Sequence, residues 1–416
     1  MSNQQIVNKE VKMINAAISD KPRITITSYK AQDLQSFTES TLAFAIDLYH
    51  ALRKQDGNLF FSPHSIYQAL SMTYAGARGQ TEKEITETLH ITLPQDRLHA
   101  ANNSLSVELS RRSENAKGKD GKRISLKIVN AIWGQQDYTF LPEYLDTLAQ
   151  YYGAGIYLLD FENAPEPPRL TINEWVSEQT ENKIQNLLPA GSIDELTRMV
   201  LTNAIYFNVA WGSPFEEEFT TPDKFYLLDG STIKVQMMKQ THRFGYSEGS
   251  NYQAVRLPYR RTDLSMVILL PKEGEFNTFE KSMNQQTLTG IMDSILNRKV
   301  ALSMPKFEYN MSVGLREILS AMGMPSAFSA DKADFSGING NRELFISDAV
   351  HKAFIAVDEE GTEAAAATGI SYAGLGIPRK PEEPVKVTVN RPFVFLIRDV
   401  RTGTILFIGR VLNPSN

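Results

Sequence analysis

Hydrophobic residues recur at helical spacing in the first part of the chain. Ser36 followed by Glu39 matches a helix capping box, and the pattern beyond this pair predicts a helix that ends near residue 52. Residues 58–66 then predict an apolar strand and a helix that begins at Pro63. Further helices are expected near residues 141–151, 171–182, 276–296 and 312–322.

Apolar and alternating runs that are typical of strands dominate the later part of the chain. We expect strands at residues 126–134, 199–209, 225–228, 252–258, 264–270, 344–346, 353–357, 385–389, 393–398 and 405–411. Helices followed by many antiparallel-looking strands indicate the α+β class. We expect one large domain over residues 36–416. Residues 1–35 are expected to form an N-terminal extension, partly disordered or docked, with a short strand at residues 23–27.

The composition of the 416 residues argues against several classes of function. Cysteine is absent, so the chain has no disulfide, no thiolate nucleophile and no cysteine-bound metal. A net charge of −5 gives no reason to expect nucleic acid as a partner. The six histidines lack ligand spacing and common catalytic motifs are missing, so we expect no enzyme activity, no cofactor and no metal. No signal peptide or membrane-spanning run is evident, so the sequence alone indicates a cytoplasmic protein without membrane contact.

Residues 358–368 form the most unusual segment of the chain. Gly361 is followed by small side chains, with one carboxylate among them, up to Thr368. Glycine allows a sharp change of chain direction, and small side chains fit a crowded sheet without needing a cavity. This composition suits a segment that is first an exposed loop and later a strand. A linker or a turn of alanine-rich helix is the alternative, because alanine favours helices.

Several stretches of the chain resemble motifs of the serpins, the serine protease inhibitor superfamily. Residues 387–397 resemble the family signature, and residues 407–414 resemble its final strand and the Asn-Pro that follows. Residues 58–65, 173–184 and 361–365 are similar to three further family motifs. Together they place the resemblance over residues 37–414. The lysine and glycine usual before the tryptophan at the end of residues 207–211 are absent, and the loop after residue 368 is longer than in many relatives.

The resemblance implies a serpin fold with an exposed reactive-centre loop at about residues 359–385. That fold is a single large domain with a central, mostly antiparallel five-stranded sheet, two further sheets and about nine helices. The implied activity is suicide inhibition of a serine protease, with a cysteine protease as a second class of partner. The protease forms an acyl-enzyme at a bond in the loop, and the cut loop then inserts into the main sheet as a new strand.

The side chains of this hinge are expected to alternate between the two faces of the sheet in the way that insertion requires. Its residues are Glu359, Gly361, Thr362, Glu363, Ala364, Ala365, Ala366, Ala367 and Thr368. In a strand, the even positions from 362 to 368 would face the inner side of the sheet, and all four are small and uncharged. The charged Glu363 would face outward, where its carboxylate stays hydrated.

Counting from Gly361 in the family manner places the reactive bond between Leu375 and Gly376. A leucine at this position favours proteases of the chymotrypsin or elastase kind. Tyr372 and Arg379 are rival positions, which would suit chymotrypsin-like and trypsin-like targets. The alternative function is that of a non-inhibitory serpin acting as a carrier or chaperone. Such relatives tend to have bulky, charged or proline residues in the hinge, and the inward-facing positions of this hinge have none.

Two polar clusters are implied by the same resemblance. The shutter, beneath the point where the sheet opens, is expected to contain Ser62, Ser65, Asn203 and His351, which would exchange hydrogen bonds between the closed and open sheet. The breach, where the loop first enters, is expected to contain Trp211, Lys306 and Glu359, with an ion pair between the last two.

A basic cluster lies between the helix that begins at Pro63 and the strand expected at residues 126–134. It consists of Arg111, Arg112, Lys117, Lys119, Lys122 and Arg123. Some relatives bind sulfated polysaccharides near this position, but acidic residues and glycines dilute the charge here, so we expect a hydrated loop and no polyanion site. We expect a monomer, and the family's default location is extracellular. The N-terminal extension is hypothesised to stabilise the strained form through Ile24 and Ile26.

Overall fold

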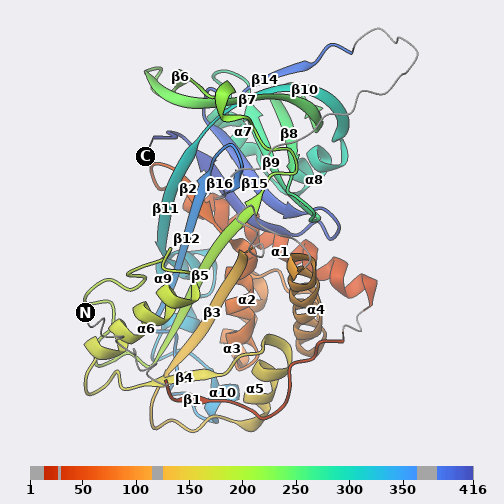
Figure 1. Cartoon of the computed structure of the whole chain (residues 1–416). Helices are drawn as coiled ribbons and strands as arrows, with labels where there is room; N and C mark the ends of the chain where they lie inside the picture. Colours follow the sequence, from red (N-terminus) through yellow and green to blue (C-terminus); the bar gives the residue numbers. More distant parts are fainter. Residues whose placement is uncertain (1–13, 27–29, 115–124, 363–381, 416) are drawn as a thin grey trace, which may run out of the picture.

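The main sheet crosses the lower and middle parts of the molecule in Figure 1. This computed structural model describes residues 14–26, 30–114, 125–362 and 382–415. The strands of the main sheet are β1 (Ala16–Ala17), β3 (Ser125–Gln135), β4 (Ile156–Leu159), β5 (Met199–Ala210), β11 (Phe307–Gly314), β12 (Asp348–Val357) and β13 (Gly361–Thr362). Their order is β1-β4-β3-β5-β13-β12-β11, and only the pairs β3–β4 and β5–β12 are parallel. Since β1 and β13 have two residues each, five longer strands of 4 to 12 residues make up most of this mainly antiparallel sheet.

A second array of nine strands fills the upper part of Figure 1. Its strands are β2 (Leu59–Phe61), β6 (Thr221–Tyr226), β7 (Thr232–Glu248), β8 (Tyr252–Pro258), β9 (Leu264–Pro271), β10 (Leu296–Pro305), β14 (Val385–Thr388), β15 (Phe393–Asp399) and β16 (Ile405–Val411). The order is β14-β10-β7-β8-β9-β15-β16-β2, with β6 paired to β7. The two further sheets expected from sequence join here, because the 17-residue strand β7 pairs with β6, β8 and β10 along different parts of its length.

The described helices surround these sheets and gather mainly in the lower half of Figure 1. The α-helices are α1 (Ala31–Leu52), α2 (Pro63–Tyr74), α3 (Gly79–Thr88), α4 (Gln95–Glu114), α5 (Pro142–Thr147), α6 (Glu166–Gln179), α7 (Phe276–Ser282), α8 (Gln285–Asp293), α9 (Leu315–Met322) and α10 (Ser336–Asn339). A π-helical turn η1 (Leu148–Tyr152) extends α5, and two short 3-10 turns are η2 (Glu217–Phe219) and η3 (Pro325–Phe328).

Strand β5 is buried on both faces, which explains its continuous apolar sequence. Leu201, Ile205 and Val209 face the large core shared with the helices and the second array. Val200 and Tyr206, on the opposite face, belong to a smaller core beneath α6. Any strand inserted beside β5 must therefore present small or apolar side chains to the large core.

Several expectations about local structure were wrong. Helix α1 begins at Ala31, five residues before the capping box at Ser36. Residues 31–35 are helical, and the side chain of Lys30 does not cap the helix. Residues 344–346 are not a strand; the strand begins at Asp348, where the chain meets β5 and β11. Helix α6 begins at Glu166, since prolines are tolerated in the first helical turn.

The N-terminal segment docks differently from the expected strand at residues 23–27. Its described residues pair through β1 with the edge strand β4, and Leu158 donates its backbone N–H to Asn15. An open sheet edge offers unpaired backbone groups, which this short strand covers. Ile26 is 82% exposed, so the hypothesised apolar contact through it is absent.

Candidate functional site

The start of the predicted loop is already inserted at one end of the main sheet. Strand β13 lies between β5 and β12, where Gly361 pairs with Ala210 and Thr362 pairs with both Val209 and Val357. Below this point the gap closes, because residues 348–354 of β12 pair directly with residues 200–206 of β5. The sheet is therefore split only at the end where the hinge enters.

A tight turn from β12 into β13 brings the hinge into this position. The Asp358 carboxylate accepts backbone hydrogen bonds from Glu360 (2.9 Å) and Gly361 (3.2 Å), and the Asp358 N–H donates to the Gly361 carbonyl (3.0 Å). An aspartate that accepts from the residue two positions later is a typical turn former. A Cβ on Gly361 would lie 2.4 Å from the Val209 carbonyl oxygen, so only glycine fits at this point of the sheet.

Trp211 secures the turn from the side of β5. Its backbone N–H donates to the Glu360 carbonyl (2.8 Å), and its indole Nε1 donates to the Asp358 carbonyl (3.0 Å). The indole stacks on the ring of Tyr259, with centroids 4.8 Å apart. The Tyr259 hydroxyl in turn lies 2.9 Å from the Thr362 hydroxyl.

Glu359 forms the ion pair that was expected at the breach. Its carboxylate lies 2.7 Å from the Lys306 ammonium and accepts a hydrogen bond of 2.7 Å from the Thr220 hydroxyl. Burial by itself would raise the pKa of Glu359, but Lys306, Thr220 and a backbone hydrogen bond together outweigh burial and hold the pKa below its usual value. The Glu359 side chain is only 5% exposed, so this contact differs from an ordinary solvated surface pair.

The four residues expected at the shutter form one hydrogen-bonded network beneath β5 and β12. Ser62 caps α2 by accepting from the Ser65 N–H (3.1 Å), and its own backbone N–H donates to His351 Nε2 (3.2 Å). His351 Nε2 is therefore an acceptor, and Nδ1 carries the proton that is donated to the side-chain Oδ1 of Asn203. Complete burial lowers the pKa of His351 to about 3, which keeps the imidazole neutral. The Asn203 amide donates to the Ser65 hydroxyl (2.5 Å).

Asn130 belongs to this network, and the sequence analysis missed it. Its side-chain oxygen accepts from Asn203 and from the Ser65 hydroxyl, and its amide donates to the Gln68 side chain (3.1 Å). Gln68 donates onward to Ser106 on α4 (2.8 Å). An asparagine within the apolar run of β3 was the available signal, because a polar residue in a buried strand needs hydrogen-bond partners.

Several predicted site residues lie outside the described residues. These are the reactive bond Leu375–Gly376, its rivals Tyr372 and Arg379, the hinge from Glu363 to Thr368, and Lys117, Lys119, Lys122 and Arg123 of the basic cluster. The side chain of Arg112 is likewise not described. Arg111 donates to the Thr25 carbonyl (2.8 Å), so its guanidinium contacts the N-terminal segment.

The described part of the chain contains no group of three or more His, Asp or Glu side chains placed to hold a metal ion. None of its helices combines the length and apolar character that a membrane crossing requires.

The chain was then compared with known protein families and relatives. A family model described as "Serpin (serine protease inhibitor)" matches residues 39–414, nearly the whole chain. The chain belongs to the serpin family. It is 39% identical to an uncharacterized serpin-like protein of Thermococcus kodakarensis, over 90% of this chain and 85% of that protein. It is also 39% identical to leukocyte elastase inhibitor A of Mus musculus, over 92% of this chain and all of that protein.

The serpin fold is equally evident from solved structures. The thermophilic serpin tengpin in its native state superposes with a TM-score of 0.83 and 28% identity, covering 97% of this chain and all of tengpin. Family membership and the named relatives support protease inhibition as the activity of this serpin.

Proposed function

We propose that this serpin traps a serine protease as an acyl-enzyme after cleavage at Leu375–Gly376. The severed loop then continues the path of β13 and separates β5 from β12. The position of β13 carries this proposal, because it leads from the hinge directly into the seam between these two strands. The serpin acts as a monomer in this mechanism, since one chain supplies both the loop and the sheet.

The energetics support insertion. The cut loop replaces one direct β5–β12 pairing with two antiparallel pairings, one on each side of the new strand. About 10–14 additional backbone hydrogen bonds, each worth about 0.5–1.5 kcal/mol, give a driving force on the order of 10 kcal/mol. This equals the whole stability of a typical domain, so the uncut form is held kinetically short of its most stable state.

We further propose that the targets are proteases of the elastase or chymotrypsin kind. Leu375 would fill an apolar primary pocket, and relatives that cover this chain almost completely are named leukocyte elastase inhibitors. The hinge also supports inhibition over a carrier role, because its inward positions are small and uncharged.

The test is incubation with elastase, chymotrypsin and trypsin, followed by denaturing gel electrophoresis and mass spectrometry. We expect a covalent band at the summed mass with the first two enzymes, and a released C-terminal peptide that begins at Gly376. Leu375→Arg is expected to transfer complex formation to trypsin, which needs a cationic side chain. Cleavage without any covalent band, at every enzyme ratio, would refute trapping, and a peptide that begins elsewhere would refute the assigned bond.

A further inference from the structure

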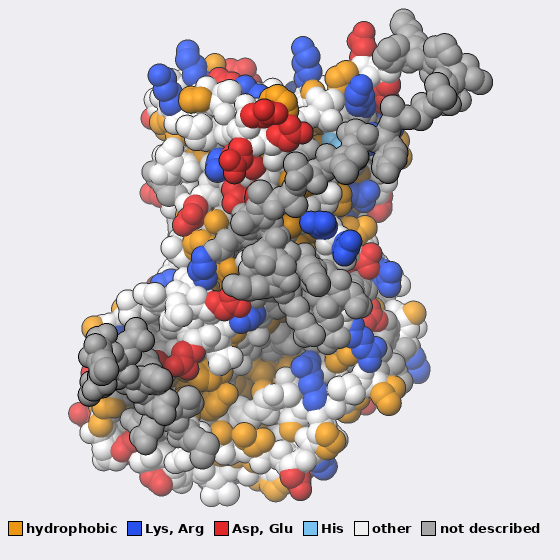
Figure 2. All heavy atoms as spheres, in the orientation of Figure 1, with side chains coloured by type: hydrophobic (Ala, Val, Ile, Leu, Met, Phe, Trp, Pro, Cys, Tyr) orange, Lys and Arg blue, Asp and Glu red, His pale blue; other side chains and the backbone are white. Residues whose placement is uncertain are grey.

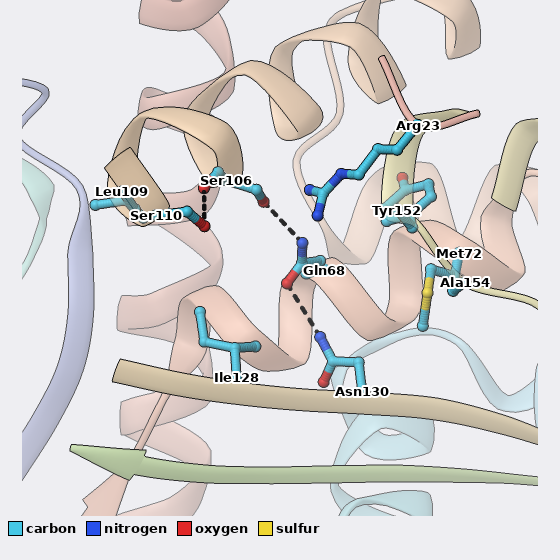
Figure 3. Close-up of a pocket in the computed structure, with 10 residues that line it drawn as sticks. All are labelled: Arg23, Gln68, Met72, Ser106, Leu109, Ser110, Ile128, Asn130, Tyr152 and Ala154. Carbon is cyan, nitrogen blue, oxygen red and sulfur yellow. Dashed lines mark hydrogen bonds between the residues drawn. The ribbon is translucent and has the colours of Figure 1, made fainter. Parts of the chain in front are cut away.

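A cavity of about 180 Å³ lies between the main sheet and the helices, next to the shutter network (Figure 3). Helices α2 and α4 supply Gln68, Met72 and Ser106, while β3 supplies Ile128 and Asn130. The cavity adjoins an outer hollow of about 460 Å³ that shares Asn130 as a lining residue. Figure 2 shows this face of the molecule hollowed in its lower half, with hydrophobic side chains around the hollow.

Arg23 of the N-terminal segment points into this cavity (Figure 3). Its Nε donates to the Asn103 side chain (3.1 Å), and no described carboxylate pairs with its guanidinium. The side chain passes over Gly153, where a Cβ would come within 3.0 Å of Arg23 Cδ. Burial lowers the pKa of Arg23. By contrast, Lys21 of the same segment forms an ion pair of 2.6 Å with Asp146.

A partly buried guanidinium that has no acidic partner among the described residues favours an anionic ligand. None of the described residues that line the cavity or the adjoining hollow is acidic. Arginine holds carboxylates through two parallel hydrogen bonds, which adds geometric specificity to the charge. Charge balance favours a single negative charge, because a phosphate dianion would leave its second charge uncompensated in a partly desolvated site.

The residues that line the cavity indicate the other chemical features of the ligand. Met72, Leu109 and Ile128 provide apolar surface, and a cavity of roughly 150 Å³ is large enough for a benzene ring. Hydroxyl and amide groups of Ser106 and Gln68 lie beside the cavity and are already hydrogen-bonded to each other. We propose that this cavity binds a small monocarboxylate whose carboxylate pairs with Arg23 and whose ring-sized apolar body rests on Met72 and Ile128.

Binding is tested on the intact, uncut protein by titration calorimetry with benzoate as the probe. A ligand of this size is expected to bind with a Kd of about 1 mM. At 20 mM benzoate the midpoint of thermal unfolding should rise by about 2 °C. Because no protease is present, this result is independent of the proposed trapping mechanism.

Matched ligands and variants separate this site from nonspecific binding. Benzamide, the neutral analogue, and phosphate at equal ionic strength should bind at least about tenfold more weakly than benzoate. Arg23→Gln should weaken benzoate binding about tenfold, whereas Lys21→Gln, which removes a cation already paired with Asp146, should leave the Kd within about twofold.

Ala154→Leu provides a second route, because it fills the cavity while leaving Arg23 in place. It should abolish benzoate binding even if Arg23→Gln fails to fold. Equal binding of benzoate and benzamide, or an unchanged Kd in either the Arg23→Gln or the Ala154→Leu variant, would overturn the proposal.

Discussion

The hydroxyl oxygens of Tyr259 and Thr362 lie 2.9 Å apart, and both residues are almost completely buried. Thr362 pairs with Val209, whose side chain faces the large core, so the threonine faces the same side. The first inward hinge position therefore already has a fixed polar partner before any cleavage. The alternation expected from sequence assigns this face to Thr362, whereas positions 364, 366 and 368 lie outside the described residues.

Thr362→Arg should turn the inhibitor into a substrate. Placing a guanidinium opposite Val209 would bury a charge without a partner, which costs several kcal/mol and slows insertion relative to deacylation. On a denaturing gel we expect at least about tenfold more cleaved serpin per covalent complex. Thr362→Val is the matched control, because it keeps the shape and removes only the hydrogen bond to Tyr259. If the arginine variant retained the original ratio of complex to cleaved product, an uncharged side chain at position 362 would not be needed for trapping.

Glu359 should contribute an acid-sensitive part of the stability of the native serpin. Its pKa is held below the usual 4.5 by Lys306 and Thr220, so the unfolded chain takes up the proton first as the pH falls. The stabilisation is fully present above about pH 4.5 and is lost as the pH falls through the lower folded pKa. Urea unfolding of the wild type and of Glu359→Gln should differ at pH 7 by about 1–3 kcal/mol, and the difference should be smaller at pH 3. A constant difference at both pH values would contradict this account.

His351 should add a second pH dependence in a higher range. Burial lowers its pKa from 6.5 to about 3, so between these values the unfolded state binds more protons than the folded state. Its contribution is complete above pH 6.5 and declines as the pH falls toward 3. Because His64 and His99 are also buried with pKa values of about 4, the informative quantity is the wild type minus His351→Gln. That difference in unfolding free energy should shrink steadily from pH 7 to pH 4, and a flat difference would exclude the neutral buried imidazole.

The N-terminal segment should slow the conversion of the uncut serpin to an inserted form. Lys21 pairs with Asp146, and the Ile24 N–H donates to Gln150 (2.9 Å), so the segment joins the edge of the main sheet to the helical side. Deleting residues 1–26 should lower the midpoint of thermal unfolding by about 2 °C or more and speed the loss of inhibitory activity on storage. Ile26→Asp is the control, since this exposed side chain should tolerate a charge. A deletion variant that keeps the full storage lifetime would exclude the stabilising role.

Sequence patterns identified much of the architecture because the strands concerned are locally unambiguous. Strands β8 and β16 both have the predicted bounds, since each is a mainly apolar run next to turn-forming residues. Pro63 and the Ser62 cap likewise define the start of α2 through local hydrogen bonds. By contrast, the strand expected at residues 344–346 failed, because an apolar run is also compatible with a buried segment that has no strand partner.

In the candidate site, too, some residues were predictable from the sequence and others were not. Family motifs in the sequence named Ser62, Asn203 and His351, but Asn130 emerged only from the packing of β3 against α2. The contact of Arg23 with this cavity could not be predicted from the sequence either. The other residues that line the cavity lie more than forty positions along the chain, and the sequence does not show which distant segments meet.

The sequence by itself determined the class of the fold, the family and a hinge whose small residues could enter a sheet, because these depend on local side-chain size and periodicity. Only the tertiary structure decided how far the hinge has entered, which polar groups meet beneath the seam, and where a guanidinium lies without a described acidic partner. These are properties of contacts between distant segments, and such contacts depend on strand register and packing.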